Sequence, residues 1–167
     1  MPSAKTTHVV AELPGSRYSV VVLPVLLAIF WWPALWAGKM LLHYDAGYFS
    51  LPLAWLHGQA LAGHDTLLWS NRIYGGHPIF AEGQGGFVDP LNILAVWLFS
   101  PTRALGFLHW ATMSIGGVGV FVLGRILSIS RWSATFAAIV SVFSGAWVFN
   151  QHDYPVMSTL AWMPWLL

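Results

Sequence analysis

Long runs without a charged side chain divide the sequence, and four of them predict membrane spans. Three of them are each 21 residues long: Tyr18–Gly38, Ala104–Gly124 and Trp132–His152. A helix of about 20 residues is long enough to cross the roughly 30 Å hydrocarbon core of a bilayer. The fourth run, Tyr154–Leu167, extends to the last residue. The pattern predicts an all-α, polytopic membrane protein with about four transmembrane helices.

A further apolar segment, Pro90–Thr102, has only 13 residues, a length typical of an interfacial or re-entrant helix. If it does not cross the bilayer, the tail with Lys5 and Arg17 lies on the same side as Arg125–Arg131. The positive-inside rule then places both in the cytoplasm. The predicted layout is a cytoplasmic tail (1–17), a first transmembrane helix (18–42), an extracytoplasmic loop with interfacial segments (43–103), and transmembrane helices two to four (104–167).

The first run has two interpretations, a cleaved signal peptide or a retained membrane anchor. It is longer than a typical signal-peptide core and lacks a clear small-x-small cleavage site, which favours the anchor. Pro24 and Pro33 are expected to kink this helix, because each proline removes a backbone hydrogen bond.

The composition supports a protein of the cell membrane. Hydrophobic residues make up 57% of the chain and charged residues 8%, against about 25% charged in soluble domains. The net charge of +1 argues against a nucleic-acid partner. The absence of cysteine excludes a disulfide scaffold, a thiolate zinc site and a cysteine nucleophile. Membrane lipid is therefore the first expected partner.

The segment 43–89 holds four of the six acidic residues and four of the seven histidines. Loops of more than about 12–15 residues are uncommon unless they are functional or disordered, and this one is too rich in aromatic and apolar residues for disorder. Within it, Phe49–Ala62 is expected to form a short amphipathic helix on the membrane surface. Trp69 and Tyr74 are expected to anchor the loop at the interface.

Asp45 and Asp153 are the candidate catalytic acids, since each follows the end of a predicted span on the same side of the membrane. A carboxylate that is partly desolvated there can act as a general base or bind a divalent cation. The alternative is an ordinary solvated acid at a helix end. His43 is close enough in sequence to join Asp45. No spacing matches a defined metal motif, so the cofactor is unassigned, with a divalent metal ion at the two acids left open.

Other ionisable residues have two interpretations each. His109 lies inside the second predicted span and is either functional or hydrogen-bonded to a neighbouring helix. Arg72 and Arg103 are placed to hold a lipid phosphate, with Lys39 as a snorkelling alternative. Ordinary anchoring to lipid headgroups explains them equally well.

Several short strings resemble a known family. They are Tyr74-Gly75-Gly76-His77-Pro78-Ile79-Phe80-Ala81, Gln84, Asp89-Pro90-Leu91-Asn92, Trp69-Ser70-Asn71, Gly124-Arg125-Ile126-Leu127 and Ala161-Trp162-Met163-Pro164. Together with the order of spans and loops, they resemble YfhO-type membrane proteins of the GT-C glycosyltransferase superfamily, over about residues 40–167.

The resemblance implies transfer of a sugar from a polyprenyl-phosphate-linked donor to a cell-envelope acceptor on the outer membrane face. It implies that Asp45 is catalytic, with Asp153 as the second acid. The expected substrate-binding residues are His43, Arg72, His77, Gln84, Arg103 and His152. Since members of this family have more spans, the chain is expected to be an N-terminal fragment.

Two other functions stay open, a non-catalytic membrane subunit and a transporter fragment. A transporter usually carries ionisable residues near the bilayer midplane. The predicted spans here are nearly free of charge and the acids gather outside them, which favours chemistry at the surface.

Overall fold

The computed structural model describes residues 18–39 and 45–167. His43 and the tail 1–17 therefore lie outside the described residues. Within the described ranges all regular elements are helical, apart from one isolated bridge between Ser70 and His77. The helices are α1 (Ser19–Phe30), α2 (Trp32–Leu35), the π-helix η2 (Ala46–Ser50), α3 (Leu51–Leu61), α4 (Ile79–Glu82), α5 (Pro90–Leu98), α6 (Pro101–Ile126), α7 (Arg131–Val142), α8 (Gly145–Phe149), the 3-10 turn η3 (Asn150–His152), α9 (Tyr154–Trp162) and the 3-10 turn η4 (Met163–Trp165).

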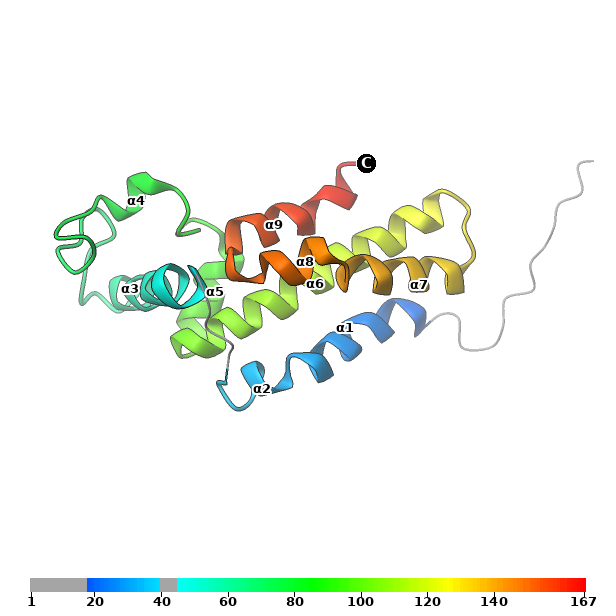
Figure 1. Ribbon diagram of the computed structural model, residues 1–167, viewed down its shortest axis with the longest axis horizontal. Helices are drawn as coiled ribbons and strands as arrows, with labels where there is room; N and C mark the ends of the chain where they lie inside the picture. The colour runs from blue at the N-terminus through cyan, green and yellow to red at the C-terminus, as the bar shows by residue number, and fades with distance from the viewer. Residues whose placement is uncertain (1–17, 40–44) are drawn as a thin grey trace, which may run out of the picture.

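The long helix α6 is the centre of the structure, and α1, α7 and α9 lie along it (Figure 1). Glycines let these helices approach closely. A Cβ on Gly106 would lie 2.7 Å from the Cβ of Ala34, so α2 meets the backbone of α6 there. The main apolar cluster joins α1, α6, α7, α8 and α9 through Leu23, Leu27, Met113, Ala138, Val142, Trp147, Met157 and Ala161.

The two ends of this bundle differ. The segments α3, α4 and α5 gather at the end where α6 begins (Figure 1). The start of α1 and the connection between α6 and α7 lie at the opposite end. We call 43–89 the acid-rich segment. Its described part and the Arg125–Arg131 turn are therefore at opposite ends of α6, as the predicted topology requires.

Among residues 18–39 and 45–167, two of the four predicted spans are long and apolar enough to cross a membrane. They are Pro101–Ile126, with 26 residues, and Arg131–His152, with 22 residues. The second of these bends after Val142, where α7 gives way to α8. The predicted beginning of span four corresponds to α9, which has nine residues and passes into the turn η4, which contains Pro164.

The first predicted helix, 18–42, is interrupted within the part that the structure describes, and Pro33, where a kink was expected, lies at this interruption. The helix α1 ends at Phe30 after 12 residues, and α2 restarts at Trp32. Pro33 explains the interruption, because its nitrogen cannot donate to the carbonyl of Ile29 and its ring clashes with that carbonyl. Pro24, in contrast, lies inside α1 without ending it.

The outer segment contains the predicted short helices. Most of the predicted helix Phe49–Ala62 is present as α3, whose buried residues Leu53, Leu56 and His57 face the protein. The helix α5 has nine residues and is therefore only about 14 Å long, well short of the hydrocarbon thickness. It packs against α3 and the first turns of α6.

Candidate functional site

A cavity of about 170 Å³ lies where the acid-rich segment meets the beginning of α6. Its lining comes from η2, α3, the loop before α5, α6, η3 and α9. Four of the predicted site residues line it: Asp45, Gln84, His152 and Asp153. The structure thus brings both candidate acids to one cavity, although they are far apart in the sequence. The wall is apolar and consists mainly of Phe49, Leu53, Ala54, Leu105 and Leu108.

Asp45 directly precedes η2, at the mouth of the cavity. Its side chain is exposed and makes no capping hydrogen bond to η2. The expectation that this carboxylate is partly desolvated at the membrane boundary stays a prediction. An exposed carboxylate that the helix does not use remains available to a ligand entering the cavity.

Asp153 also stabilises the beginning of a helix. It is the N-cap residue of α9, where its Oδ1 accepts a hydrogen bond of 3.4 Å from the backbone N–H of Val156. Asp residues favour this position because the first helical N–H groups lack partners within the helix. Nearby, the Ser50 hydroxyl donates to the carbonyl of His152 at 3.3 Å. This bond ties the segment that carries Asp153 to the end of η2.

His109 is fully enclosed below the cavity. Its ring nitrogens contact the carbonyl of Leu105, at 2.6 Å, and the carbonyl of Gln151. Of the two interpretations made from the sequence, hydrogen bonding to a neighbouring segment is confirmed. His109 thereby fixes the turn η3, and with it His152 and Asp153, against α6.

Three polar contacts hold the loop that carries Gln84. The side-chain amide of Asn92 donates to the carbonyls of Gly85 and Gly86, at 2.8 and 3.1 Å. Gly86 has φ +62°, and a Cβ there would lie 2.8 Å from the Asn92 amide nitrogen, so this position requires glycine. The third contact joins this loop to α9: the Tyr154 hydroxyl donates to Oδ2 of Asp89 at 2.5 Å.

Sequence reasoning missed Ser50, Asn92 and Tyr154 as residues that shape the cavity. Asn92 belongs to the Pro-Leu-Asn string and Tyr154 follows a candidate acid, so both lay beside residues already singled out. Asp89 could have been recognised as a helix cap from the Asp-Pro pair before an apolar run. Its Oδ1 accepts from the backbone N–H of Leu91 at 2.9 Å.

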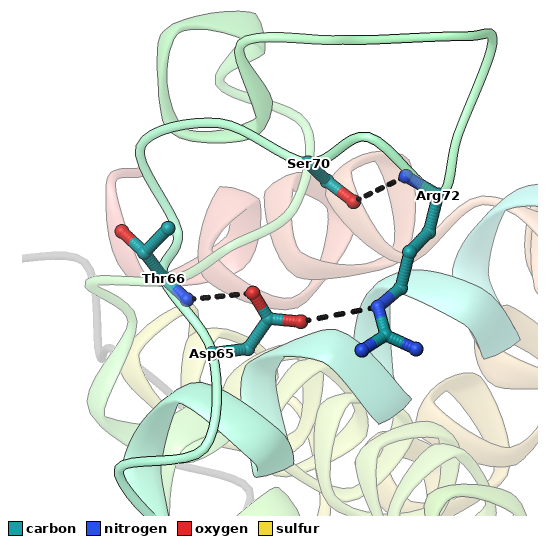
Figure 2. A network of polar contacts seen from close by, with 4 residues as sticks. All are labelled: Asp65, Thr66, Ser70 and Arg72. Carbon is teal, nitrogen blue, oxygen red and sulfur yellow. Dashed lines mark hydrogen bonds and ion pairs between the residues drawn. The ribbon is translucent and has the colours of Figure 1, made fainter.

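Three other predicted site residues do not line the cavity. Arg72 is paired with Asp65, with 3.4 Å between Nε and Oδ2, and lies 5.3 Å from the centre of the Trp55 ring. Figure 2 shows this pair together with Thr66 and Ser70. The backbone N–H of Thr66 donates to the Asp65 carboxylate, and the backbone N–H of Arg72 donates to the Ser70 hydroxyl. His77 lies 3.8 Å from the carboxylate of Glu82. Arg103 lines a separate groove.

In the described ranges, 18–39 and 45–167, no three His, Asp or Glu side chains are grouped so that they could share a metal ion. The cavity therefore offers two carboxylates, an amide and an imidazole around an apolar wall. Such a site can accept protons and hydrogen bonds from a small polar group while an apolar portion of the ligand lies against the wall.

The loop is also held by Phe87, whose ring meets the buried His57 ring edge to face at 5.1 Å. Neither ring nitrogen of His57 has a hydrogen-bond partner among the described residues. Burial lowers the pKa of His57 from its ordinary value of 6.5, and the neighbouring Asn92 offsets only part of this effect. The folded protein thus keeps this ring neutral under conditions in which the unfolded chain is protonated.

Stability is expected to fall as the pH is lowered through about 6.5, because the unfolded chain then binds a proton that folded His57 does not. The slope contributed by this residue is at most about 1.4 kcal/mol per pH unit. Melting temperatures in detergent between about pH 7.5 and pH 5 measure it. The His57→Leu variant should show a shallower slope than wild type, and the exposed-site control His64→Gln should not. Equal slopes for wild type and His57→Leu would contradict the assignment.

Comparisons of the chain with protein families, with curated proteins and with solved structures find no match.

Proposed function

We propose that this chain forms the outer-face acidic site of a membrane glycosyltransferase that moves a sugar from a polyprenyl-phosphate-linked donor to a cell-envelope acceptor. The observation that carries the proposal is the convergence of Asp45 and Asp153 on one cavity next to an apolar wall. The resemblance to YfhO-type proteins supplies the substrate class.

The proposed sugar transfer needs a carboxylate that can accept a proton and a second group that holds the acceptor. The acceptor hydroxyl gives its proton to a carboxylate, and its oxygen bonds to the anomeric carbon of the sugar. The bond from that carbon to the donor phosphate breaks, and polyprenyl phosphate leaves with the electron pair. General-base help of this kind contributes about 10²–10⁴-fold. Asp45 is the proposed base, since the helix end does not use its carboxylate, and Asp153 contacts the acceptor.

The cavity is smaller than the roughly 300–1,000 Å³ of pockets that bury a drug-sized ligand. It therefore accommodates the sugar end of the donor, while the polyprenyl chain stays in the lipid. Gln84 and His152 are proposed to hydrogen-bond the sugar hydroxyls. Arg72 is proposed to act only indirectly, because Asp65 already engages it.

The test is release of polyprenyl phosphate from a polyprenyl-phosphate-linked sugar by the intact protein in liposomes. Release that depends on an added envelope acceptor supports the proposal. A protein that inserts normally but never consumes the donor overturns it, and favours the non-catalytic subunit instead.

We further propose a multi-pass topology in the cell membrane with a cytoplasmic N-terminus. The bundle supports it, because the start of α1 and the connection between α6 and α7 lie at one end, opposite α3 and α5 (Figure 1). The cavity is lined from η2, α3 and the beginning of α6.

A single cysteine introduced into the cysteine-free chain tests this topology. At Ser128, in the turn after α6, it is expected to resist an impermeant thiol reagent added from outside intact cells. At Asn71, in the acid-rich segment, it should be labelled readily, because this residue is exposed. Labelling at Ser128 with protection at Asn71 would reverse the assignment.

A further inference from the structure

A groove lies between the α1–α2 segment and the first turns of α6, with a volume of about 240 Å³. Its lining is Ala28, Leu35, Trp36, Phe99, Arg103, Phe107 and Trp110. Arg103, Phe107 and Trp110 are four and three residues apart on α6, so they share one helix face. Leu105, which lines the cavity, lies roughly 200° around the helix from Arg103. The groove and the cavity are thus on opposite faces of α6.

The aromatic wall of this groove is fixed in place. The rings of Phe99 and Phe107 lie 5.3 Å apart, and those of Phe107 and Trp110 lie 5.7 Å apart. The indole N–H of Trp110 donates to the carbonyl of Pro24 at 3.0 Å, which joins the wall to α1. Trp36 at the edge is 71% exposed. A preformed apolar wall of this kind suits a hydrocarbon chain.

One cation, Arg103, is part of the groove's lining, and a second, Lys39, follows Gly38, which lies next to Arg103. Arg103 and Lys39 are both exposed, and among residues 18–39 and 45–167 neither has an ion-pair or side-chain hydrogen-bond partner. Gly38 brings them together: a Cβ there would lie 3.6 Å from Cγ and Nε of Arg103, and Lys39 is the next residue. The backbone N–H of Lys39 donates to the carbonyl of Pro33 at 2.9 Å, which anchors it to α2.

We propose that this groove binds one anionic phospholipid, with its phosphate between Lys39 and Arg103 and one acyl chain along Phe99, Phe107 and Trp110. Charge complementarity favours this occupant, because two neighbouring cations that have no acidic partner among the described residues lie beside an apolar, aromatic wall. Each cation near a membrane surface adds about fivefold to the affinity for an anionic lipid. The inference rests on the membrane placement proposed above and is independent of sugar transfer.

The experiment is native mass spectrometry of the full chain in detergent with equal amounts of dioleoylphosphatidylglycerol and dioleoylphosphatidylcholine. Wild-type protein is expected to retain the anionic lipid at least about fivefold more than the zwitterionic one. Arg103→Gln should reduce this preference severalfold, and the Lys39→Gln/Arg103→Gln double variant should bring it close to one. Arg103→Lys keeps the charge and should retain most of the preference.

Arg72→Gln is the matched control, since it removes one cation from the same end of the molecule but away from the groove, and it should leave the preference unchanged. Equal retention of both lipids by wild type overturns the inference, as does an undiminished preference in the double variant. The phospholipid is not the occupant if inorganic phosphate alone displaces the anionic lipid. The same holds if polyprenyl phosphate displaces it at a concentration tenfold lower than that of the lipid. Because no sugar is transferred in this assay, loss of transferase activity with an intact lipid preference would count against the proposed function alone.

Discussion

Asp45→Asn in the intact protein is expected to lower the rate of sugar transfer by about 10²-fold or more. Asparagine keeps the shape of the side chain but cannot accept the proton of the acceptor hydroxyl. The exposed position of Asp45, without a capping bond to η2, means that the substitution leaves no buried group unpaired. Transfer from a polyprenyl-phosphate-linked sugar in liposomes measures the effect, and membrane insertion should be unchanged.

Asp65→Asn is the matched control, because it makes the same chemical change in the same segment. Asp65 is held by Arg72 and by the backbone N–H of Thr66, outside the cavity (Figure 2). Its loss should reduce transfer far less. If Asp45→Asn transfers sugar at the wild-type rate, Asp45 is not the base, and Asp153 becomes the first candidate. Asp153→Asn preserves an oxygen for the cap of α9 and so tests the charge separately from the fold.

Gly106→Ala is expected to lower the free energy of unfolding by about 1–3 kcal/mol, the usual cost of forcing extra atoms into a well-packed contact. The new Cβ would lie 2.7 Å from the Cβ of Ala34 and 3.1 Å from its carbonyl carbon. Backbone atoms cannot move aside as a flexible side chain can, so α2 must shift away from α6. The melting temperature in detergent measures this loss.

Gly145→Ala provides the comparison, because a Cβ there meets no atom within 4 Å. Both substitutions add the same methyl group; Gly106 lies inside α6, where the gain in helix propensity is roughly 1 kcal/mol, and Gly145 is the first residue of α8, where the gain is smaller. Gly145→Ala should therefore leave the melting temperature unchanged or raise it. Equal behaviour of the two variants would show that α2 does not press on α6 as described.

The pattern of uncharged runs predicted the strongest elements of the fold correctly. Ala104–Gly124 lies within α6, and Trp132–His152 corresponds to the second apolar segment that is long enough to span. Counting uncharged residues alone does not show that the first run is divided, because hydropathy does not register a missing backbone donor; the kink was expected only from Pro33 itself. The same limit applies to Pro164 beyond α9.

The candidate site was predictable where topology alone determines it. Asp45 and Asp153 both follow predicted spans that end on one side, and they line one cavity. The partner of Arg72 was not predictable, because the choice between a lipid phosphate and Asp65 depends on the path of the loop between them. Likewise, no spacing rule links Asp89 to Tyr154, which meet only after α5, α6 and α7 have packed.

The hydrogen bond between Tyr154 and Asp89 joins residues that are 65 positions apart in the chain. At synthesis rates of about 5–20 residues per second, Tyr154 is made roughly 3–13 s after Asp89. During that interval the acid-rich segment has no α9 against which to close. The cavity is consequently a late product of biosynthesis, and a chain interrupted before Tyr154 carries Asp45 without Tyr154 and Pro155, which complete the lining.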